Sequence, residues 1–137
     1  MIFLVLIINL ILRIPSFFEP YWYGDEGIYL AIGQALQRGA ILYRDIWDNK
    51  TPLLYLIYAL NPTLLWAKVS ATLFVLGTVF FVHKISKNYL VALLTGILLS
   101  LPLLEGTIAN AELYFILPIA ITAYLFLRHP AGRRDLL

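Results

Sequence analysis

Four long stretches almost free of charged residues limit what this chain can fold into more than any other feature. They cover residues 1–18, 63–82, 89–104 and 109–127. A helix needs about 20 apolar residues to cross a bilayer, with a range of about 17 to 25. The second stretch meets this length and the fourth nearly does. The third is slightly short, and the first is long enough only if it continues through Pro15 to Phe18. We therefore predict an all-α, polytopic membrane protein with about four transmembrane helices in one membrane domain, residues 1–137.

Composition supports lipid as the environment of these stretches. Hydrophobic residues make up 61% of the chain and charged residues 13%, against about 25% charged residues in ordinary soluble domains. The first stretch has no basic residue before its apolar core and no small-residue cleavage site after it, so we expect a retained span and not a signal peptide. The chain has no cysteine, which excludes disulfides and thiolate metal sites. The lipid bilayer is the expected partner, and nucleic acid is not.

The basic residues predict how the chain is oriented. They lie between the second and third stretches and after the fourth: Lys84, Lys87, Arg128, Arg133 and Arg134. By the positive-inside rule these two segments are cytoplasmic. The loop of residues 16–62, which has five acids against three bases, is then extracytoplasmic, and the turn of residues 105–112 opens on the same side. We predict a multi-pass protein of the plasma membrane.

Two short helices are expected inside the loop of residues 16–62. In residues 26–38 apolar side chains recur at helical spacing, so one face can rest on the membrane. Asp25 is placed to cap this helix, and Gly39 to end it in the left-handed conformation. A second helix is predicted with Thr51 as N-cap and Pro52 in its first turn, ending at Leu60. The segment between them, residues 43–50, mixes charges with aromatic rings, as segments at the headgroup level do.

Three places in the chain have residues suited to chemistry. Asp25 and Glu26 put two carboxylates at a helix start, where a general base or a metal ligand fits. The simpler alternative is a cap followed by a first-turn acid. Lys50 precedes a helix N-terminus, an arrangement that favours phosphate, although it could instead pair with Asp48 or extend to lipid headgroups. Glu112 follows Asn110 at the mouth of the fourth stretch, where an acid is either functional or a partner of the helix N-terminus with Asn110 as its cap.

Other polar and aromatic residues have simpler explanations. Arg13 and Lys68 lie near the outer ends of spans and are expected to extend toward the headgroups. Glu105 resembles Glu112 but is less specific, and His83 has no sequence partner for a metal site. The aromatic residues of the loop are expected to form an interfacial belt: Tyr21, Trp22, Tyr23, Tyr43 and Trp47.

The order of these motifs resembles that of a known enzyme family. The first span ends in an arginine, the loop opens with Tyr23-Gly24-Asp25-Glu26-Gly27-Ile28-Tyr29, and Tyr43-Arg44-Asp45-Ile46-Trp47-Asp48-Asn49-Lys50-Thr51-Pro52 and Asn110-Ala111-Glu112 follow. This order resembles the N-terminal part of GT-C membrane glycosyltransferases, the group that includes protein O-mannosyltransferases and aminoarabinose transferases. Those enzymes are several times longer, so we expect the chain to be a fragment of a longer enzyme.

The resemblance implies roles for individual residues. Asp25, with Glu26 beside it, would be the catalytic base. Lys50 would hold the phosphate of a polyprenyl-phosphate sugar donor, with Asp48, Arg44 and Tyr43 in the same substrate-binding segment. Glu112 would line the same cavity. The implied reaction transfers a sugar, with inversion, from the lipid carrier to an acceptor hydroxyl on a glycan, lipid or protein.

The sequence departs from the family pattern at two positions. Thr51 replaces the first of the two prolines that usually follow the lysine, and Asn49 stands where some relatives have a metal-binding acid. A divalent metal cofactor is thus left open, with Asp48 as the residue that could bind it.

Two other functions are alternatives to a glycosyltransferase: a non-catalytic protein that binds a polyprenyl-phosphate lipid, and a transporter fragment. Charges avoid the centres of the spans, which argues against a transporter.

Overall fold

The computed structural model describes residues 1–20 and 23–129, and this part of the chain is all-helical apart from an isolated β-bridge between Leu42 and Ile46. The α-helices and the two short 3-10 helices are, in chain order, α1 (Ile2–Arg13), η1 (Ile14–Phe18), α2 (Gly24–Gln37), α3 (Pro52–Leu60), α4 (Leu64–Ser86), α5 (Tyr89–Leu98), η2 (Pro102–Leu104) and α6 (Ala111–Arg128). The predicted fold class, all-α, is confirmed.

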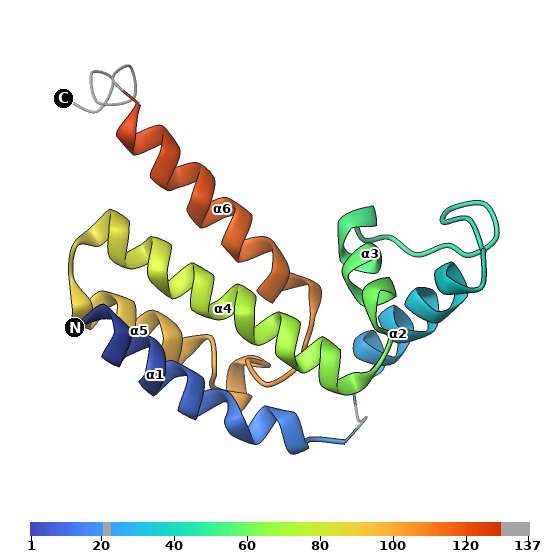
Figure 1. The fold of residues 1–137 in the computed structure, drawn as a ribbon, viewed down its shortest axis with the longest axis horizontal. Helices are drawn as coiled ribbons and strands as arrows, with labels where there is room; N and C mark the ends of the chain where they lie inside the picture. Colours follow the sequence, from blue (N-terminus) through green and yellow to red (C-terminus); the bar gives the residue numbers. More distant parts are fainter. Residues whose placement is uncertain (21–22, 130–137) are drawn as a thin grey trace.

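Helix α4 is the centre of the fold, because α1, α5 and α6 all pack against it. In Figure 1, α1, α4 and α5 lie side by side, and α6 begins beside α4 and diverges from it toward the C-terminus. The N-terminus lies beside the turn that joins α4 to α5, and the packed pair α2 and α3 occupies the opposite end of the molecule. The segment between α5 and α6 returns to that opposite end, where it contacts Glu26 through Ala109. The two acid-rich connections of the chain are therefore brought together.

Two helices are long and apolar enough to cross a membrane, α4 with 23 residues and α6 with 18. At about 1.5 Å per residue they are about 35 and 27 Å long, close to the hydrocarbon thickness of about 30 Å. The helical stretch Ile2–Phe18 and helix α5 are shorter, so the prediction of four spans is not confirmed. Prolines explain both: Pro15 lies where α1 gives way to a 3-10 helix, and the residue before Pro102, Leu101, is extended (ψ 125°).

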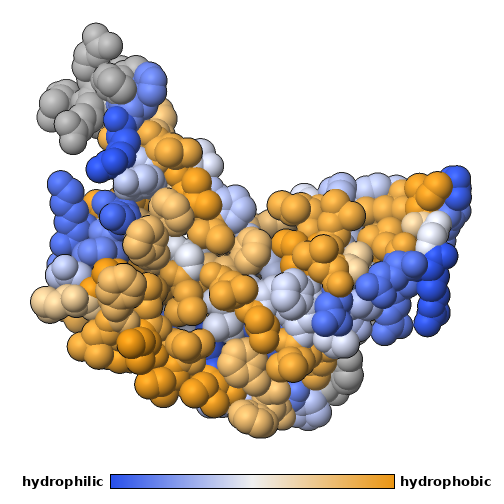
Figure 2. Space-filling model, viewed as in Figure 1, coloured by the Kyte–Doolittle hydropathy of each residue, from blue (hydrophilic) through white to orange (hydrophobic). Residues whose placement is uncertain are grey.

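Apolar side chains cover much of the surface of the long helices. Figure 2 shows hydrophobic residues over the face formed by α1, α4 and α5, with hydrophilic residues gathered at the two ends of the molecule. Phe3 and Ile119 expose 76% and 66% of their surface. Scattered exposed apolar residues are ordinary, but a continuous apolar surface indicates contact with lipid or with another protein.

The predictions for the loop helices are confirmed in part. Thr51 occupies the N-cap position of α3 with Pro52 in the first turn, and Gly39 follows α2 at φ +91°. The predicted cap of α2 is wrong: Tyr23 is the N-cap, without a side-chain hydrogen bond, and Asp25 lies inside the first turn. Gly24 already has helical geometry, so α2 begins one residue before Asp25, which was expected to lie just outside the helix.

Only part of the face of α2 that was expected to rest on the membrane packs against other helices, since Ile28 on that face is 47% exposed, and α2 also packs against α3. Gly33 allows this contact, because a Cβ there would lie 2.9 Å from the carbonyl carbon of Tyr58. Ile32 is buried in the core. In α3 the exposed apolar side chains Leu53, Leu56 and Leu60 recur at helical spacing. Helix α3 therefore has an apolar outer face, and α2 adds the exposed Ile28.

Candidate functional site

The neighbouring acids Asp25 and Glu26 lie in different environments. The Glu26 carboxylate is fully buried, 2.6 Å from the Nζ of Lys68, and accepts a hydrogen bond from the backbone N–H of Ala109 at 2.5 Å. Lys68 is also fully buried. It donates to the carbonyl of Thr107 at 2.9 Å and lies 3.7 Å from a carboxylate oxygen of Glu19. Glu19, Glu26 and Lys68 form what we call the buried ion network, which ties α2 and α4 to the segment before α6.

Arg13 is buried next to this network. Its guanidinium donates to Thr72 Oγ1 at 2.9 Å, to the carbonyl of Leu99 at 3.1 Å and to the carbonyl of Gly106 at 2.5 Å. The expectation that Arg13 and Lys68 extend toward headgroups is wrong for both, since their exposed fractions are 1% and 0%. Their long side chains turn inward because carbonyls and carboxylates there satisfy the cations, as buried charges require. Together they hold the segment between α5 and α6 against α1 and α4.

Asp25 points away from the buried ion network and is partly exposed. Its Oδ2 accepts a hydrogen bond from the hydroxyl of Tyr29 at 3.1 Å. The Tyr29 ring lies edge-on to those of Tyr55 and Tyr58, with centroids 6.0 and 5.6 Å away. Burial, together with the nearby Asp25 charge, raises the pKa of Tyr29, so its hydroxyl stays protonated and donates. Sequence reasoning missed Tyr29, although its i, i+4 spacing from Asp25 was a usable signal.

Lys50 lies at the start of α3 within reach of α6. Its Nζ is 4.0 Å from Glu112 Oε1, and the two side chains are 28% and 64% exposed. The Lys50 backbone is fixed from both sides: its carbonyl accepts from the Tyr43 hydroxyl at 2.6 Å, and its N–H donates to the Tyr55 hydroxyl at 3.0 Å. In the part of the chain that the structure describes, the ion pair of Lys50 is thus with Glu112 and not with Asp48.

Asp48 and Arg44 have partners of their own in the loop between α2 and α3. Asp48 accepts from the Tyr55 hydroxyl at 2.8 Å. Arg44 donates two hydrogen bonds to the Asp45 carboxylate, both at 2.8 Å, and holds the pKa of Asp45 below its usual range. Asp45 in turn accepts from the N–H of Ile41 at 2.8 Å. The guanidinium of Arg44 therefore stabilises the loop turn, while Asp48 supports the position of Lys50 through Tyr55.

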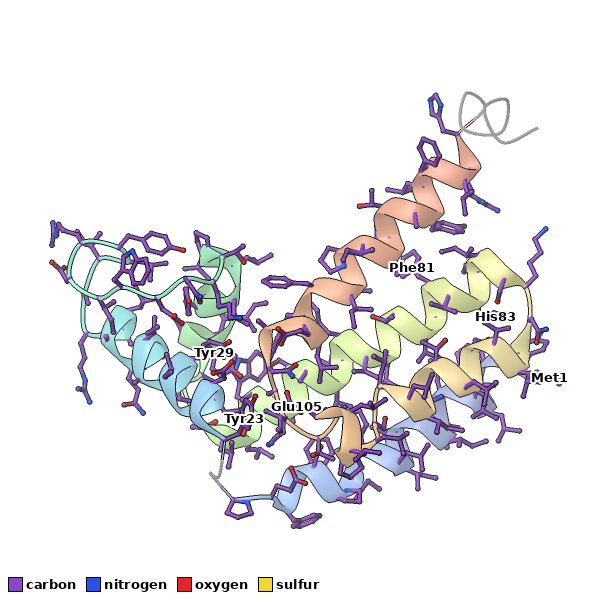
Figure 3. All side chains as sticks on the ribbon, turned by 180° about the vertical axis from the view of Figure 1, so that it is seen from behind. Met1, Tyr23, Tyr29, Phe81, His83 and Glu105 are labelled. Atoms are coloured by element: carbon purple, nitrogen blue, oxygen red, sulfur yellow. The ribbon has the colours of Figure 1, made fainter. Side chains whose placement is uncertain are left out.

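Glu105 adds another exposed carboxylate to this end of the molecule. It accepts from the Tyr23 hydroxyl at 3.2 and 3.3 Å and from the Asn110 amide at 3.4 Å. Figure 3 shows Tyr23, Tyr29 and Glu105 at the same end, far from Met1 and His83. The pKa of Tyr23 is raised by Glu105 first, and also by Asp25 and Glu112. The predicted cap of α6 is confirmed, since Asn110 Oδ1 accepts from the N–H of Leu113 at 3.4 Å.

These contacts define a surface cluster made of Asp25, Asp48, Lys50, Glu105 and Glu112. A tyrosine hydroxyl donates to each of three of its acids: Tyr29 to Asp25, Tyr55 to Asp48 and Tyr23 to Glu105. Such a cluster offers a carboxylate base, a cation for an anionic group, and further acceptors for hydroxyls. Within residues 1–20 and 23–129, no three His, Cys, Asp or Glu side chains are grouped so that they could hold a metal ion. Among the described residues, Asp48 therefore does not belong to a group of three such side chains, and the question of a metal cofactor stays open.

The predicted aromatic belt is only partly within the described residues. Trp47 exposes 73% of its surface and Tyr43 45%. Tyr21 and Trp22 lie outside the described part, as do Arg133 and Arg134, two of the cations used to predict orientation. Tyr43 has an unusual backbone conformation, with φ +65°, and its hydroxyl contacts Lys50 instead of standing free in an interfacial belt.

Comparison of the chain with protein-family models, with curated proteins and with solved structures finds no match.

Proposed function

We propose that the chain is the N-terminal portion of a membrane glycosyltransferase that transfers a sugar from a polyprenyl-phosphate carrier to an extracytoplasmic acceptor. One observation carries the proposal. Asp25 of α2 accepts a hydrogen bond from Tyr29, and Lys50, just before α3, lies 4.0 Å from Glu112 of α6. Burial raises the pKa of Tyr29 first, and the charges of Asp25 and Glu112 raise it further, so these residues, distant in sequence, lie at one end of the molecule. A base for the acceptor hydroxyl and a cation for the leaving phosphate are groups that this transfer needs.

The proposed membrane arrangement builds on the two long helices. Helices α4 and α6 cross the bilayer fully, and the shorter Ile2–Phe18 stretch and α5 complete four spans in the plasma membrane, with local thinning of the bilayer around them. The loop of residues 16–62 is then extracytoplasmic. Leu53, Leu56 and Leu60 of α3 rest on the outer leaflet. The surface cluster lies at the headgroup level, where a lipid-linked donor arrives.

In the proposed reaction Asp25 accepts the proton of the acceptor hydroxyl. The hydroxyl oxygen attacks the anomeric carbon, the bond from that carbon to the phosphate oxygen breaks, and polyprenyl phosphate leaves with the bonding electrons. Lys50 and the N-terminal dipole of α3 offset the charge on the leaving phosphate. The pair of Lys50 with Glu112 is long and exposed, so a phosphate can displace the carboxylate at little cost.

The carboxylate of Glu26 has a different part in this proposal. Its charge is matched by Lys68 in the interior, so it positions the first turn of α2 and leaves the chemistry to Asp25. Arg44 and Tyr43 also act indirectly: Arg44 fixes the loop turn through Asp45, and Tyr43 fixes the backbone of Lys50. We therefore propose that these two residues contribute to substrate binding by holding Lys50 in position.

The test uses the full-length reading frame expressed in membranes and supplied with polyprenyl-phosphate sugars. Asp25→Asn should lower the transfer rate by about 10² to 10⁴, the usual contribution of a general base. Arg38→Gln is the control, since it removes the charge of an exposed side chain at the end of α2 opposite Asp25; it should keep most of the rate. Transfer by Asp25→Asn at the wild-type rate would overturn the proposal.

A binding measurement on the same membranes separates transfer from lipid binding alone. Lys50→Ala should lose affinity for polyprenyl phosphate, and Asp25→Asn should keep it. If the wild-type protein binds the lipid through Lys50 but transfers no sugar from any polyprenyl-phosphate donor, the chain is a lipid-binding protein and the transferase proposal fails.

A further inference from the structure

A second polar region lies at the end of the molecule opposite the surface cluster. A cavity of about 340 Å³ lies between the ends of α4 and α6 and is lined by Lys84, Ile85, Lys87, Tyr124, Leu127 and Arg128. Three of its six lining residues are cationic, and the other three supply apolar walls. We call it the basic pocket.

Aromatic rings hold two of the three cations in place. The Lys84 ammonium lies over the Phe80 ring at 5.2 Å from its centroid, and the Arg128 guanidinium lies over the Tyr124 ring at the same distance. The Tyr124 ring packs against Phe81 of α4, with centroids 5.5 Å apart. The contact between α4 and α6 therefore also fixes the ring over which Arg128 lies. Cation–π contacts orient a cation without neutralising its charge.

The charge of the basic pocket is not balanced by carboxylates in the described residues. The ion pairs among the described residues involve the cations Arg44, Lys50 and Lys68, none of which lines the basic pocket. The described acids lie in residues 19–48 and 105–112, at the end marked by Tyr23 and Glu105 in Figure 3, whereas His83 marks the end with the basic pocket. The C-terminal ends of α4 and α6 favour these cations through their dipoles, but three cations around one cavity still favour an anion.

We propose that the basic pocket binds the phosphate of an anionic phospholipid. Phosphate is the anion that Lys and Arg bind with several charge-assisted hydrogen bonds, and Ile85 and Leu127 beside the cations suit the glycerol and first acyl carbons of a lipid. Basic pockets between helices at the cytoplasmic surface recognise anionic headgroups in this way. This inference rests on the membrane placement in the proposed function, but not on sugar transfer.

The test is lipid binding to the purified full chain in detergent, measured by native mass spectrometry. The probes are phosphatidylglycerol, phosphatidylcholine, whose phosphate is offset by a quaternary ammonium, and inorganic phosphate. Phosphatidylglycerol should bind at least tenfold more tightly than phosphatidylcholine, and the double variant Lys84→Gln/Arg128→Gln should lose that preference. Arg38→Gln, a change at an exposed cation of the α2 C-terminus, should keep it.

Three results would overturn the proposal: equal affinity for the two lipids, an unchanged preference in the double variant, or binding of inorganic phosphate with no preference among the lipids. The single variant Lys87→Gln covers the case in which the double variant fails to fold, and it should reduce the preference at least threefold. Asp25→Asn should bind phosphatidylglycerol like the wild type. Loss of sugar transfer and loss of lipid preference are therefore separate outcomes.

Discussion

The two lysine–glutamate pairs at the end with the surface cluster have similar chemistry and different surroundings. Lys68 and Glu26 are 2.6 Å apart and both are 0% exposed, whereas Lys50 and Glu112 are 4.0 Å apart with 28% and 64% of their side chains exposed. A buried pair that loses one partner leaves an uncompensated charge, while an exposed pair exchanges its partner for water or an incoming anion. The first pair is suited to holding the fold and the second to binding a substrate.

Helix geometry explains why the adjacent acids Asp25 and Glu26 have different partners. Consecutive residues on an α-helix differ by about 100° in direction, so Asp25 and Glu26 in the first turn of α2 cannot face the same side. Glu26 faces α4 and pairs with Lys68, and Asp25 faces the aromatic group of Tyr29 and Tyr55. One dipeptide therefore supplies a structural anchor and the candidate base.

The largest expected effect is the loss of stability in Glu26→Gln. This change removes the carboxylate at 2.6 Å from the buried Lys68 ammonium and leaves it with the carboxylate of Glu19 at 3.7 Å; loss of one partner of a buried pair costs about 3–5 kcal/mol in comparable cases. The unfolding temperature of the purified chain in detergent should fall strongly. The double variant Glu26→Leu/Lys68→Met should recover much of the loss, because an apolar pair removes both charges. A Glu26→Gln protein as stable as the wild type would contradict the anchoring role.

The next effect distinguishes the two faces of α2. In Gly33→Ala the new Cβ would lie 2.9 Å from the Tyr58 backbone, so α2 and α3 must separate, at an expected cost of about 1–3 kcal/mol. Gly27→Ala is the matched control, since nothing lies within 4 Å of a Cβ at that position, and it should be neutral or slightly stabilising. Equal effects of the two changes on the unfolding temperature would show that the contact between α2 and α3 is not tight.

Glu112→Gln should change stability little and binding more. The exposed pair with Lys50 contributes about 0–1 kcal/mol to stability, so the unfolding temperature should stay within a few degrees of the wild type. Removing the competing carboxylate should raise the affinity for polyprenyl phosphate, in the direction opposite to Lys50→Ala. A weaker affinity would mean that Glu112 supports the phosphate site instead of competing for it.

The smallest effect concerns alkaline pH. The folded-state pKa of Tyr29 is raised by burial and by Asp25 above that of the unfolded chain, which is about 10. The protonated phenol therefore contributes stability that is fully present below about pH 10 and is lost as pH rises through the folded-state pKa. The unfolding temperature should therefore fall as the pH rises above about 10. Tyr29→Phe should reduce this slope, and an unchanged slope would exclude Tyr29 as a contributor.

Local signals were predicted well from the sequence. Asn110, Thr51, Pro52 and Gly39 act on their own neighbours in the chain, so their positions at helix ends followed from short patterns. The length of α5 was overestimated because Pro102 ends the helical geometry earlier than the apolar stretch ends.

The interior contacts could not be predicted in this way. Lys68 meets Glu26, and Arg13 meets the carbonyl of Gly106, across long separations in the sequence. A lysine or an arginine near the end of an apolar stretch has the same local sequence whether it turns outward or inward. Its direction depends on acceptors that only the packing of α1, α2 and α4 brings near.

Asp25→Asn and Glu26→Gln, compared in the same membranes, test most directly whether the two adjacent carboxylates have separate roles. We expect Asp25→Asn to keep the wild-type unfolding temperature and to lose about 10² or more of the sugar-transfer rate per folded molecule. Glu26→Gln should instead lower the unfolding temperature by removing the partner of Lys68. Sugar transfer by Asp25→Asn at the wild-type rate per folded molecule would contradict the assignment of the base.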